Sequence, residues 1–325
     1  MPCLNFLQFP LFIKWYITSK CNLRCEHCYL TDYTLQPDLD TVLTLVDYFA
    51  SKRVVGIALL GGEPLARTDL EQIVERISSG GMRTKVATNG LLLSEKRVKA
   101  LTSAGLLDYQ VSLDSHDQEI NDSIRGDGTF LKIIRGIKVL KSVDSTTTII
   151  GHTLNMKNHM YVRDMYNLAR DVGVDKLRFQ LFVPIGTGAG NQENLNLDIR
   201  IAFELKKEIE SLVKESGDIE VVSPFPSSNS VTACAKTALS GCGAGTTTCV
   251  INSDMTISAC DMMTETDRTT IKASTPADFE RLWNQDRIFP KWRGEHTNDE
   301  NHPYRDVNEV TCQAAYLSYK ANIFV

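Results

Sequence analysis

The stretch Cys21-Asn22-Leu23-Arg24-Cys25-Glu26-His27-Cys28 places three cysteines within eight residues, with the spacing C-x3-C-x2-C. It follows an apolar run, residues 11–18, that predicts the first strand of a sheet. Three thiolates at this spacing can wrap one face of a cubane iron-sulfur cluster and leave one iron without a protein ligand. Such an open position invites a substrate. A structural zinc knuckle is the alternative, although three-ligand zinc sites commonly include His at other spacings.

Apolar runs alternate with helical periods along residues 11–183, which is typical of strand-helix units and a parallel sheet. The predicted strands are residues 11–18, 54–60, 84–88, 109–113, 147–154 and 177–183. The predicted helices are residues 39–51, 69–78, 94–104, 130–141, 161–171 and 198–214. These units predict an α/β fold, a partial (β/α)6 TIM-like barrel over residues 1–217. The cysteine-rich remainder, residues 218–325, predicts a small cluster-binding extension with a hairpin at 246–259.

Further motifs end the predicted strands in chain order. Gly61-Gly62-Glu63-Pro64 follows the second strand, Thr88-Asn89-Gly90 the third and Ser112-Leu113-Asp114 the fourth. Together with the three-cysteine loop, this series resembles the radical S-adenosylmethionine (SAM) superfamily over residues 11–185. The resemblance implies a 4Fe-4S cluster on Cys21, Cys25 and Cys28. It also implies that one electron from this cluster cleaves SAM, so that hydrogen is then abstracted from the substrate. The SAM-contacting residues implied by the resemblance are His27, Gly61, Gly62, Glu63, Pro64, Asn89, Ser112, Asp114 and Arg125.

The C-terminal cysteines resemble the SPASM or twitch extension of that superfamily, in which two cysteines flank a Gly. Met255 stands where that Gly is expected, between Cys242 and Cys260. Because Gly normally supplies a positive φ there, we expect Asn252 or Asp254 to take that conformation instead. The resemblance implies a second, auxiliary 4Fe-4S cluster. Its expected ligands are Cys234, Cys242, Cys260 and Cys312, with Cys249 as an alternative to Cys234.

Cys249 stands outside both ligand sets. It is either a buried core thiol or a catalytic hydrogen-atom donor, because an S–H bond is weaker than an alkyl C–H bond. The second interpretation resembles radical SAM epimerases, which act on aminoglycosides or on peptides. The loop Thr187-Gly188-Ala189-Gly190 lacks a Walker Lys, and we expect a flexible loop near the barrel mouth rather than a phosphate site.

The composition of the chain limits the kinds of molecule that it is expected to bind. The chain has 325 residues and a net charge of -5, which disfavours nucleic acid and favours a cationic substrate. Since no apolar run is long enough to span a membrane and no signal peptide is recognisable, we expect a cytoplasmic protein. A flavodoxin- or ferredoxin-type protein is the expected reductant.

The leading hypothesis is a radical SAM epimerase, resembling the neomycin type, that inverts a carbon of an aminoglycoside-like small molecule in antibiotic biosynthesis. The first alternative is a maturase that epimerises, cross-links or otherwise modifies a ribosomally made precursor peptide. A twitch-type alcohol dehydrogenase is the second alternative. Product mass separates them, because epimerisation leaves the mass unchanged and oxidation lowers it.

Overall fold

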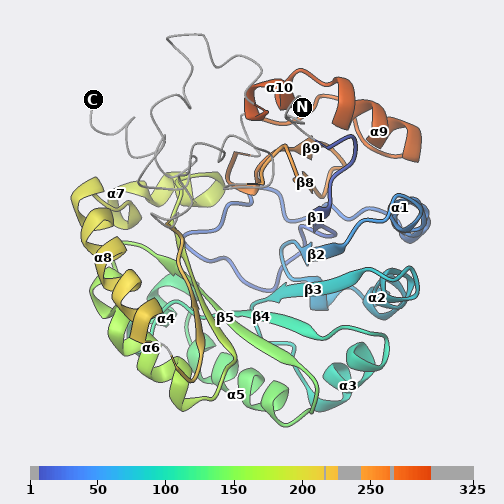
Figure 1. The fold of residues 1–325 in the computed structure, drawn as a ribbon. Helices are drawn as coiled ribbons and strands as arrows, with labels where there is room; N and C mark the ends of the chain where they lie inside the picture. The colour runs from blue at the N-terminus through green and yellow to red at the C-terminus, as the bar shows by residue number, and fades with distance from the viewer. Residues whose placement is uncertain (1–6, 216, 226–242, 264–266, 294–325) are drawn as a thin grey trace.

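The computed structural model describes residues 7–215, 217–225, 243–263 and 267–293. Its centre is one curved sheet that forms an open barrel with helices on the outside (Figure 1). The strands are β1 (Phe12–Tyr16), β2 (Gly56–Leu60), β3 (Arg83–Thr88), β4 (Asp108–Ser112), β5 (Thr147–Leu154), β6 (Lys176–Leu181), β7 (Glu220–Val222), β8 (Thr248–Ile251) and β9 (Ile257–Ser258). Their order is β7-β6-β5-β4-β3-β2-β1-β8-β9, and only the β8–β9 pair is antiparallel. The predicted α/β partial barrel is therefore confirmed.

Helices connect the parallel strands and cover their outer face. They are α1 (Leu39–Ser51), α2 (Leu70–Ser79), α3 (Glu95–Ser103), α4 (Gln118–Arg125), α5 (Thr129–Lys141), α6 (Val162–Asp171), α7 (Gln192–Leu195), α8 (Ile199–Glu215), α9 (Pro276–Gln285) and α10 (Ile288–Trp292). No helix in the described ranges is long and apolar enough to cross a membrane.

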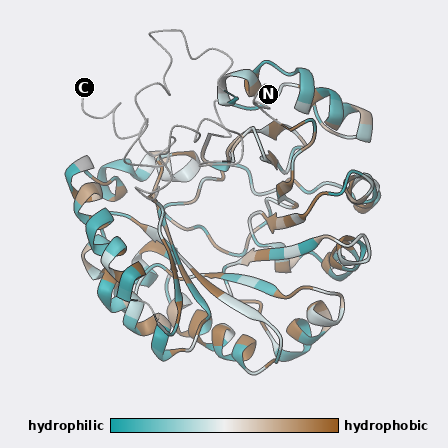
Figure 2. Ribbon diagram, viewed as in Figure 1, coloured by the Kyte–Doolittle hydropathy of each residue, from teal (hydrophilic) through white to brown (hydrophobic). Residues whose placement is uncertain are grey.

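The hydrophobic core lies between the sheet and the helices. Along β1, Ile13 and Trp15 are buried in this layer, whereas Lys14, between them, projects from the other face of the strand. The helices carry hydrophobic residues toward the sheet and hydrophilic residues outward (Figure 2). Apolar side chains therefore fill the outer layer, and the inner face of the barrel is free to carry polar groups.

Helix α4 was not predicted, and it delivers Arg125 to the end of β4. Asp117 caps its first turn by accepting a hydrogen bond from the N–H of Ile120 at 3.0 Å. The helix ends at Gly126, where φ is 115°. The Asp122 carboxylate then accepts the Gly128 N–H at 2.9 Å and so holds the turn into α5.

The described part of residues 218–325 continues the barrel sheet. Strand β7 pairs with β6, and β8 pairs with β1. Helix α9 packs on α1, with the rings of Phe49 and Phe279 4.8 Å apart. The domain boundary at residue 217 stays a prediction, but strands on both sides of it belong to one sheet.

Candidate active site

The three cysteines of residues 21–28 lie on one loop after β1, and each is partly exposed. The Cys21 sulfur accepts a hydrogen bond from the Leu23 N–H at 3.4 Å and lies 3.9 Å from Nδ2 of Asn89. Burial raises the pKa of the Cys25 thiol to about 12. The Cys25 thiol therefore becomes a thiolate ligand only when a metal takes the place of its proton.

The donor set suits a cluster better than a single ion. Within the described ranges, no three Cys, His, Asp or Glu side chains converge as they would on one metal ion. A cubane offers a separate iron to each thiolate, so its three ligands stand apart around it. The N–H groups directed at the Cys21 sulfur are also of the kind that stabilise cluster thiolates. Cys21, Cys25 and Cys28 thus fit a 4Fe-4S cluster.

A short 3-10 helix, Gly186–Asn191, packs against the cysteine loop and is hydrogen-bonded to it. The Gly188 N–H donates to the Cys28 carbonyl at 2.8 Å, and Asn191 Nδ2 donates to the Glu26 carbonyl at 2.9 Å. A Cβ at Gly186 would lie 2.1 Å from the carbonyl oxygen of Tyr29. The prediction of a flexible loop over residues 187–190 is therefore wrong, because these hydrogen bonds tie the segment to the cysteine loop.

The glycine turn after β2 packs directly against the backbone that leads into the cysteine loop. A Cβ on Gly61 would lie 2.2 Å from the Thr18 carbonyl oxygen, and one on Gly62 would lie 2.4 Å from the Lys20 carbonyl oxygen. The Gly62 N–H donates to the Thr18 carbonyl at 2.8 Å. Tyr29 adds a further tie, since its hydroxyl donates to the Gly61 carbonyl at 2.9 Å. Both glycines are needed for this close approach.

Glu63 joins this turn to the end of β3. Its buried carboxylate accepts the Leu65 N–H at 2.9 Å, the Thr88 hydroxyl at 2.8 Å and the Asn89 N–H at 2.7 Å. Burial raises the pKa of Glu63, and the three hydrogen bonds oppose that rise. Buried Pro64 then begins the 3-10 helix Pro64–Ala66. The expected SAM-contacting segments after β2 and β3 are thus held together by one carboxylate.

Asp114, Arg125 and His27 meet beside the cysteine loop. Asp114 Oδ2 lies 2.7 Å from Arg125 Nε and 3.5 Å from His27 Nε2. Neither contact is aligned as a hydrogen bond, and Nδ1 of His27 is buried without a partner in the described ranges. Burial lowers the pKa of His27 to about 4, although the Asp114 charge opposes this. His27 Nδ1, Asp114 Oδ2 and Arg125 Nε are thus buried polar atoms without a hydrogen bond, and a polar ligand such as SAM could supply one.

The remaining residue expected to contact SAM, Ser112, lies at the last position of β4. It is half-buried and pairs with Gly151 of β5. All the expected SAM contacts therefore lie at or just beyond the carboxyl ends of β1 to β4, where strands of a parallel barrel present their functional groups. Which of them touch SAM stays a prediction.

The auxiliary site is only partly described. Cys234, Cys242 and Cys312 lie outside the described residues. Cys260 follows β9, and its sulfur accepts the Met262 N–H at 3.4 Å. The second cluster stays a prediction.

Met255 itself takes the positive φ that a Gly would supply, with φ 70°. The expectation that Asn252 or Asp254 would do so is therefore wrong. Asn252 instead accepts the Met255 N–H at its carbonyl at 2.9 Å. The Met255 side chain is buried in the hydrophobic core, and this burial offsets the cost of the conformation.

Cys249 lies in β8 directly beside Ile13 of β1. Paired residues on neighbouring strands project from the same face, so its thiol points with Ile13 into the apolar layer. The side chain is fully buried, and this burial raises the pKa of the thiol. The donor role of Cys249 stays a prediction, and this placement does not favour it.

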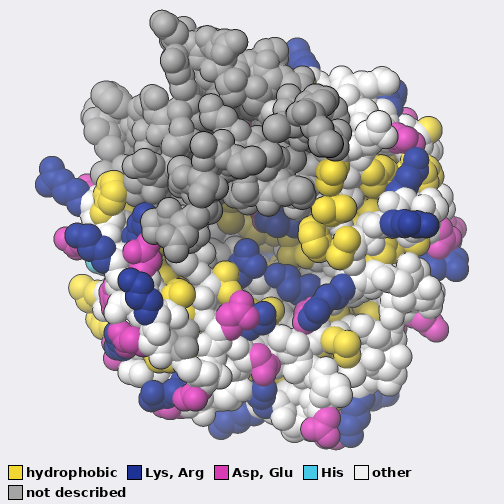
Figure 3. Space-filling view, viewed as in Figure 1, with side chains coloured by type: hydrophobic (Ala, Val, Ile, Leu, Met, Phe, Trp, Pro, Cys, Tyr) yellow, Lys and Arg dark blue, Asp and Glu magenta, His cyan; other side chains and the backbone are white. Residues whose placement is uncertain are grey.

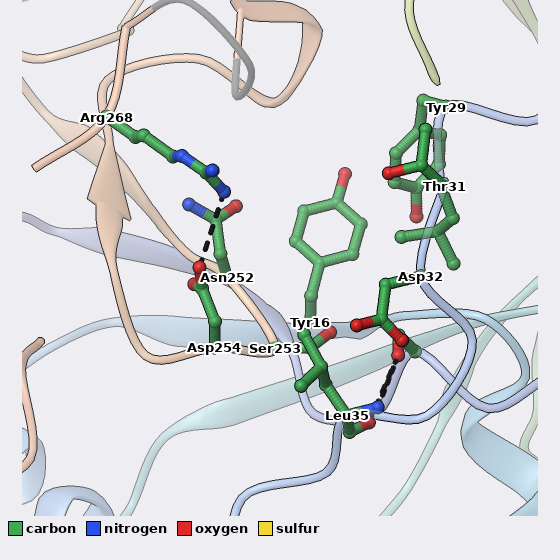
Figure 4. Close-up of a pocket in the computed structure, with 11 residues that line it drawn as sticks. Tyr16, Tyr29, Thr31, Asp32, Leu35, Asn252, Ser253, Asp254 and Arg268 are labelled. Carbon is green, nitrogen blue, oxygen red and sulfur yellow. Dashed lines mark hydrogen bonds and ion pairs between the residues drawn. The ribbon is translucent and has the colours of Figure 1, made fainter. Parts of the chain in front are cut away.

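A cleft lies beside the cysteine loop, and the space between its walls, open solvent included, is about 540 Å³. One wall comes from residues just before and just after the cysteine loop, and the other from the β8–β9 turn and Arg268 (Figure 4). Tyr16 and Tyr29 lie on the first side, whereas Asp254 and Arg268 form an ion pair of 3.3 Å on the second. Sequence reasoning did not identify this cleft, because its walls are about 220 residues apart in the sequence.

Sequence reasoning also missed three cations on the inner face of the barrel, Lys14, Lys85 and Arg178. Each sits on a strand between two buried neighbours. That alternation was visible in the sequence and would have predicted inward-facing charges.

Comparison with known proteins agrees with this geometry. Residues 15–169 match the family described as the radical SAM superfamily. The AdoMet-dependent heme synthase of Methanosarcina barkeri is 31% identical over 208 residues, which are 61% of this chain and 59% of the synthase. The mycofactocin maturase MftC of Mycolicibacterium smegmatis is 25% identical over 292 residues, which are 88% of this chain and 73% of the maturase. The chain thus spans less than two thirds of the first relative's length.

The fold is also similar to solved structures. Streptococcus suis SuiB bound to its precursor peptide SuiA has a TM-score of 0.75 at 17% identity, over 91% of this chain and 69% of SuiB. At that identity the similarity concerns the fold. The sequence match, together with the barrel and the cysteine loop after β1, identifies residues 15–169 as a radical SAM segment.

Proposed function

We propose that the chain is a radical SAM maturase of a ribosomally made precursor peptide. The observation that carries this proposal is the similarity to the mycofactocin maturase over 88% of the chain, which extends well beyond residues 15–169. The SuiB structure of the same fold holds a precursor peptide, and this chain has a cleft beside the cysteine loop. This reading replaces the aminoglycoside epimerase as the leading hypothesis.

The residues of the site have separable roles. Cys21, Cys25 and Cys28 would hold the cluster, and the segments after β2 to β4 would bind SAM. When bound, the cluster and SAM supply hydrogen abstraction from an unactivated carbon. Glu63 and the Asp114–Arg125 pair keep these segments in place, because their hydrogen bonds and charges connect the ends of neighbouring strands.

The epimerase reading loses its main support in this chain. It required a thiol that faces the substrate, whereas Cys249 lies among apolar side chains beside Ile13. An auxiliary cluster and a flavodoxin- or ferredoxin-type reductant remain part of the proposal.

The test is anaerobic turnover of the reconstituted protein with SAM and dithionite in deuterated water. Precursor peptides encoded beside the gene and neomycin-type aminoglycosides are supplied separately, and product mass is read. A mass change or deuterium uptake on a peptide, lost in Cys25→Ala, supports the maturase. Conversion of an aminoglycoside alone overturns it.

A further inference from the structure

The inner face of the barrel carries an unbalanced positive charge. Lys14, Lys85 and Arg178 stand on β1, β3 and β6, three strands that surround the same interior. Lys14 is neutralised, because its Nζ lies 2.9 Å from both carboxylate oxygens of Asp261. Figure 3 shows Lys and Arg side chains gathered in the middle of the visible face, below the grey atoms.

The other two cations lack such a partner. Lys85 Nζ donates to Oε1 of Gln110, a neutral group, at 3.0 Å. Arg178 makes no hydrogen bond or ion pair with any residue in the described ranges. Asp108 lies beside Lys85 in the β3–β4 register, but it already pairs with Arg83, just as Asp261 pairs with Lys14. Two carboxylates, Asp108 and Asp261, therefore face four cations, Arg83, Lys14, Lys85 and Arg178, and an excess of positive charge remains.

This arrangement is unfavourable without a ligand. Holding a cation away from water is unfavourable unless a countercharge compensates it. Burial, followed by the charges of Arg178 and Lys14, lowers the pKa of Lys85 to about 8. The interior thus holds Lys85 in a state that a bound anion would relieve.

We propose that Lys85 and Arg178 bind a carboxylate of the substrate inside the barrel. A carboxylate can accept two N–H bonds from a guanidinium and a further one from an ammonium group. The acidic net charge of the whole chain favoured a cationic substrate, but the interior carries the opposite sign. This inference shares one assumption with the proposed function, namely that the substrate enters the barrel.

The position also orients the substrate. Lys85 lies on β3 four residues before Asn89, which directly follows that strand, and this is about 13 Å at the rise of an extended chain. The carboxylate would therefore sit deeper than the cysteine loop, and the rest of the substrate would extend toward the SAM-contacting segments. Peptides carry carboxylates on Asp and Glu side chains and at the C-terminus, so this chemistry agrees with a peptide substrate.

The test measures binding rather than turnover. The reconstituted protein with SAM is treated anaerobically with acetic anhydride near the Lys85 pKa of about 8, and acetylation of Lys85 is quantified by peptide mass spectrometry. Glutarate, its neutral diamide, a diamine of the same length with both nitrogens quaternised so that acetic anhydride cannot acylate it, and inorganic phosphate are added separately at equal ionic strength. Exposed Lys132 on α5 provides the internal control.

Glutarate should slow acetylation of Lys85 at least about fivefold, because an anion shields the amine and raises its pKa. Lys132 should not respond, and Arg178→Met should remove most of the protection. Equal protection by the diamide or the diamine, or none by glutarate, overturns the proposal. Stronger protection by phosphate overturns the carboxylate assignment. Protection by glutarate without any peptide product would disprove the proposed function and leave the anion site standing.

Discussion

Asp114 and Arg125 form a buried ion pair in which Oδ2 lies 2.7 Å from Nε, and less than a tenth of either side chain is exposed. Asp114 lies two residues after the end of β4 and Arg125 is the last residue of α4, so the pair fixes the helix to the strand. The Asp114 N–H strengthens this link by donating to Asn121 Oδ1 at 3.2 Å.

Arg125→Met should lower the free energy of unfolding by about 3 to 5 kcal/mol, because it leaves a buried carboxylate unpaired. The double variant Asp114→Asn, Arg125→Met should be clearly more stable than Arg125→Met alone. Asn retains an oxygen for the Thr153 N–H, which Asp114 accepts at 2.8 Å. Anaerobic urea unfolding of the reconstituted proteins measures both values. Equal losses in the single and double variants would mean that charge pairing is not the cause.

Glu63→Gln tests the link between β2 and β3. One of the two oxygens becomes an NH2 group that faces a donor, so about 1 to 3 kcal/mol of unfolding free energy should be lost. Glu75→Gln, on the exposed face of α2, should change little. Urea unfolding gives the stabilities, and iron per chain reports whether the cysteine loop still binds its cluster. A Glu63 variant as stable as the Glu75 variant would contradict the role of these hydrogen bonds.

The sequence predicted the barrel because its signals are local. Alternation in residues 147–154 and helical periods such as residues 39–51 each bury one face, and the structure has strand and helix at those same bounds. The three-residue strand β7 was missed because so short a segment has no period. Helix α9 was also missed, although Thr275 before Pro276 is a recognisable helix start.

The roles of individual side chains were harder to predict from the sequence than the helices and strands were. The cysteine loop and the glycine turn were identified because their chemistry requires particular residue types. The orientation of Cys249 depends on which face of β8 it occupies, and pairing with β1 decides that. The φ of Met255 depends on tertiary packing that overrides its own preference. Contacts between segments that are distant in the sequence therefore determine the orientation of Cys249 and the φ of Met255, which the local sequence could not predict.

His152 predicts a pH dependence of stability. Burial lowers its pKa to about 4, with Arg125 and His27 adding to the effect and Asp114 opposing it. Because the folded pKa lies below the unfolded value of about 6.5, the stabilising contribution is complete above that value and is lost as the pH falls toward 4.

From about pH 7.5 to pH 5.5, this histidine should remove about 1 kcal/mol from the free energy of unfolding. His152→Gln should flatten the profile over that range, whatever its effect at neutral pH. Anaerobic urea unfolding at several pH values checks the slope. An unchanged slope in the variant would show that His152 does not stay neutral in the fold.

Met255 and Ser145 allow backbone strain to be separated from burial. Both have a positive φ, 70° and 72°, but Met255 is buried and Ser145 is exposed. Ser145→Gly relieves the strain without losing contacts and should stabilise by up to about 1 kcal/mol. Met255→Gly should instead destabilise by about 1 to 3 kcal/mol, because the lost burial exceeds the relief. The midpoint of thermal unfolding should rise in Ser145→Gly and fall in Met255→Gly. A stabilised Met255→Gly would mean that the relief of backbone strain exceeds the loss of burial at this position.

Cys249→Ala distinguishes the two interpretations of this thiol. If Cys249 is a packing residue, the variant should lose about 1 kcal/mol of stability and still modify a peptide at a rate close to that of the parent. Both proteins should take up deuterium from the solvent equally, because a thiol packed beside Ile13 cannot reach a radical in the barrel interior. The measurement is peptide product mass in deuterated water together with the amount of SAM cleaved. Continued SAM cleavage with product lost in the variant would restore the donor role, and it would require β8 to turn its other face inward.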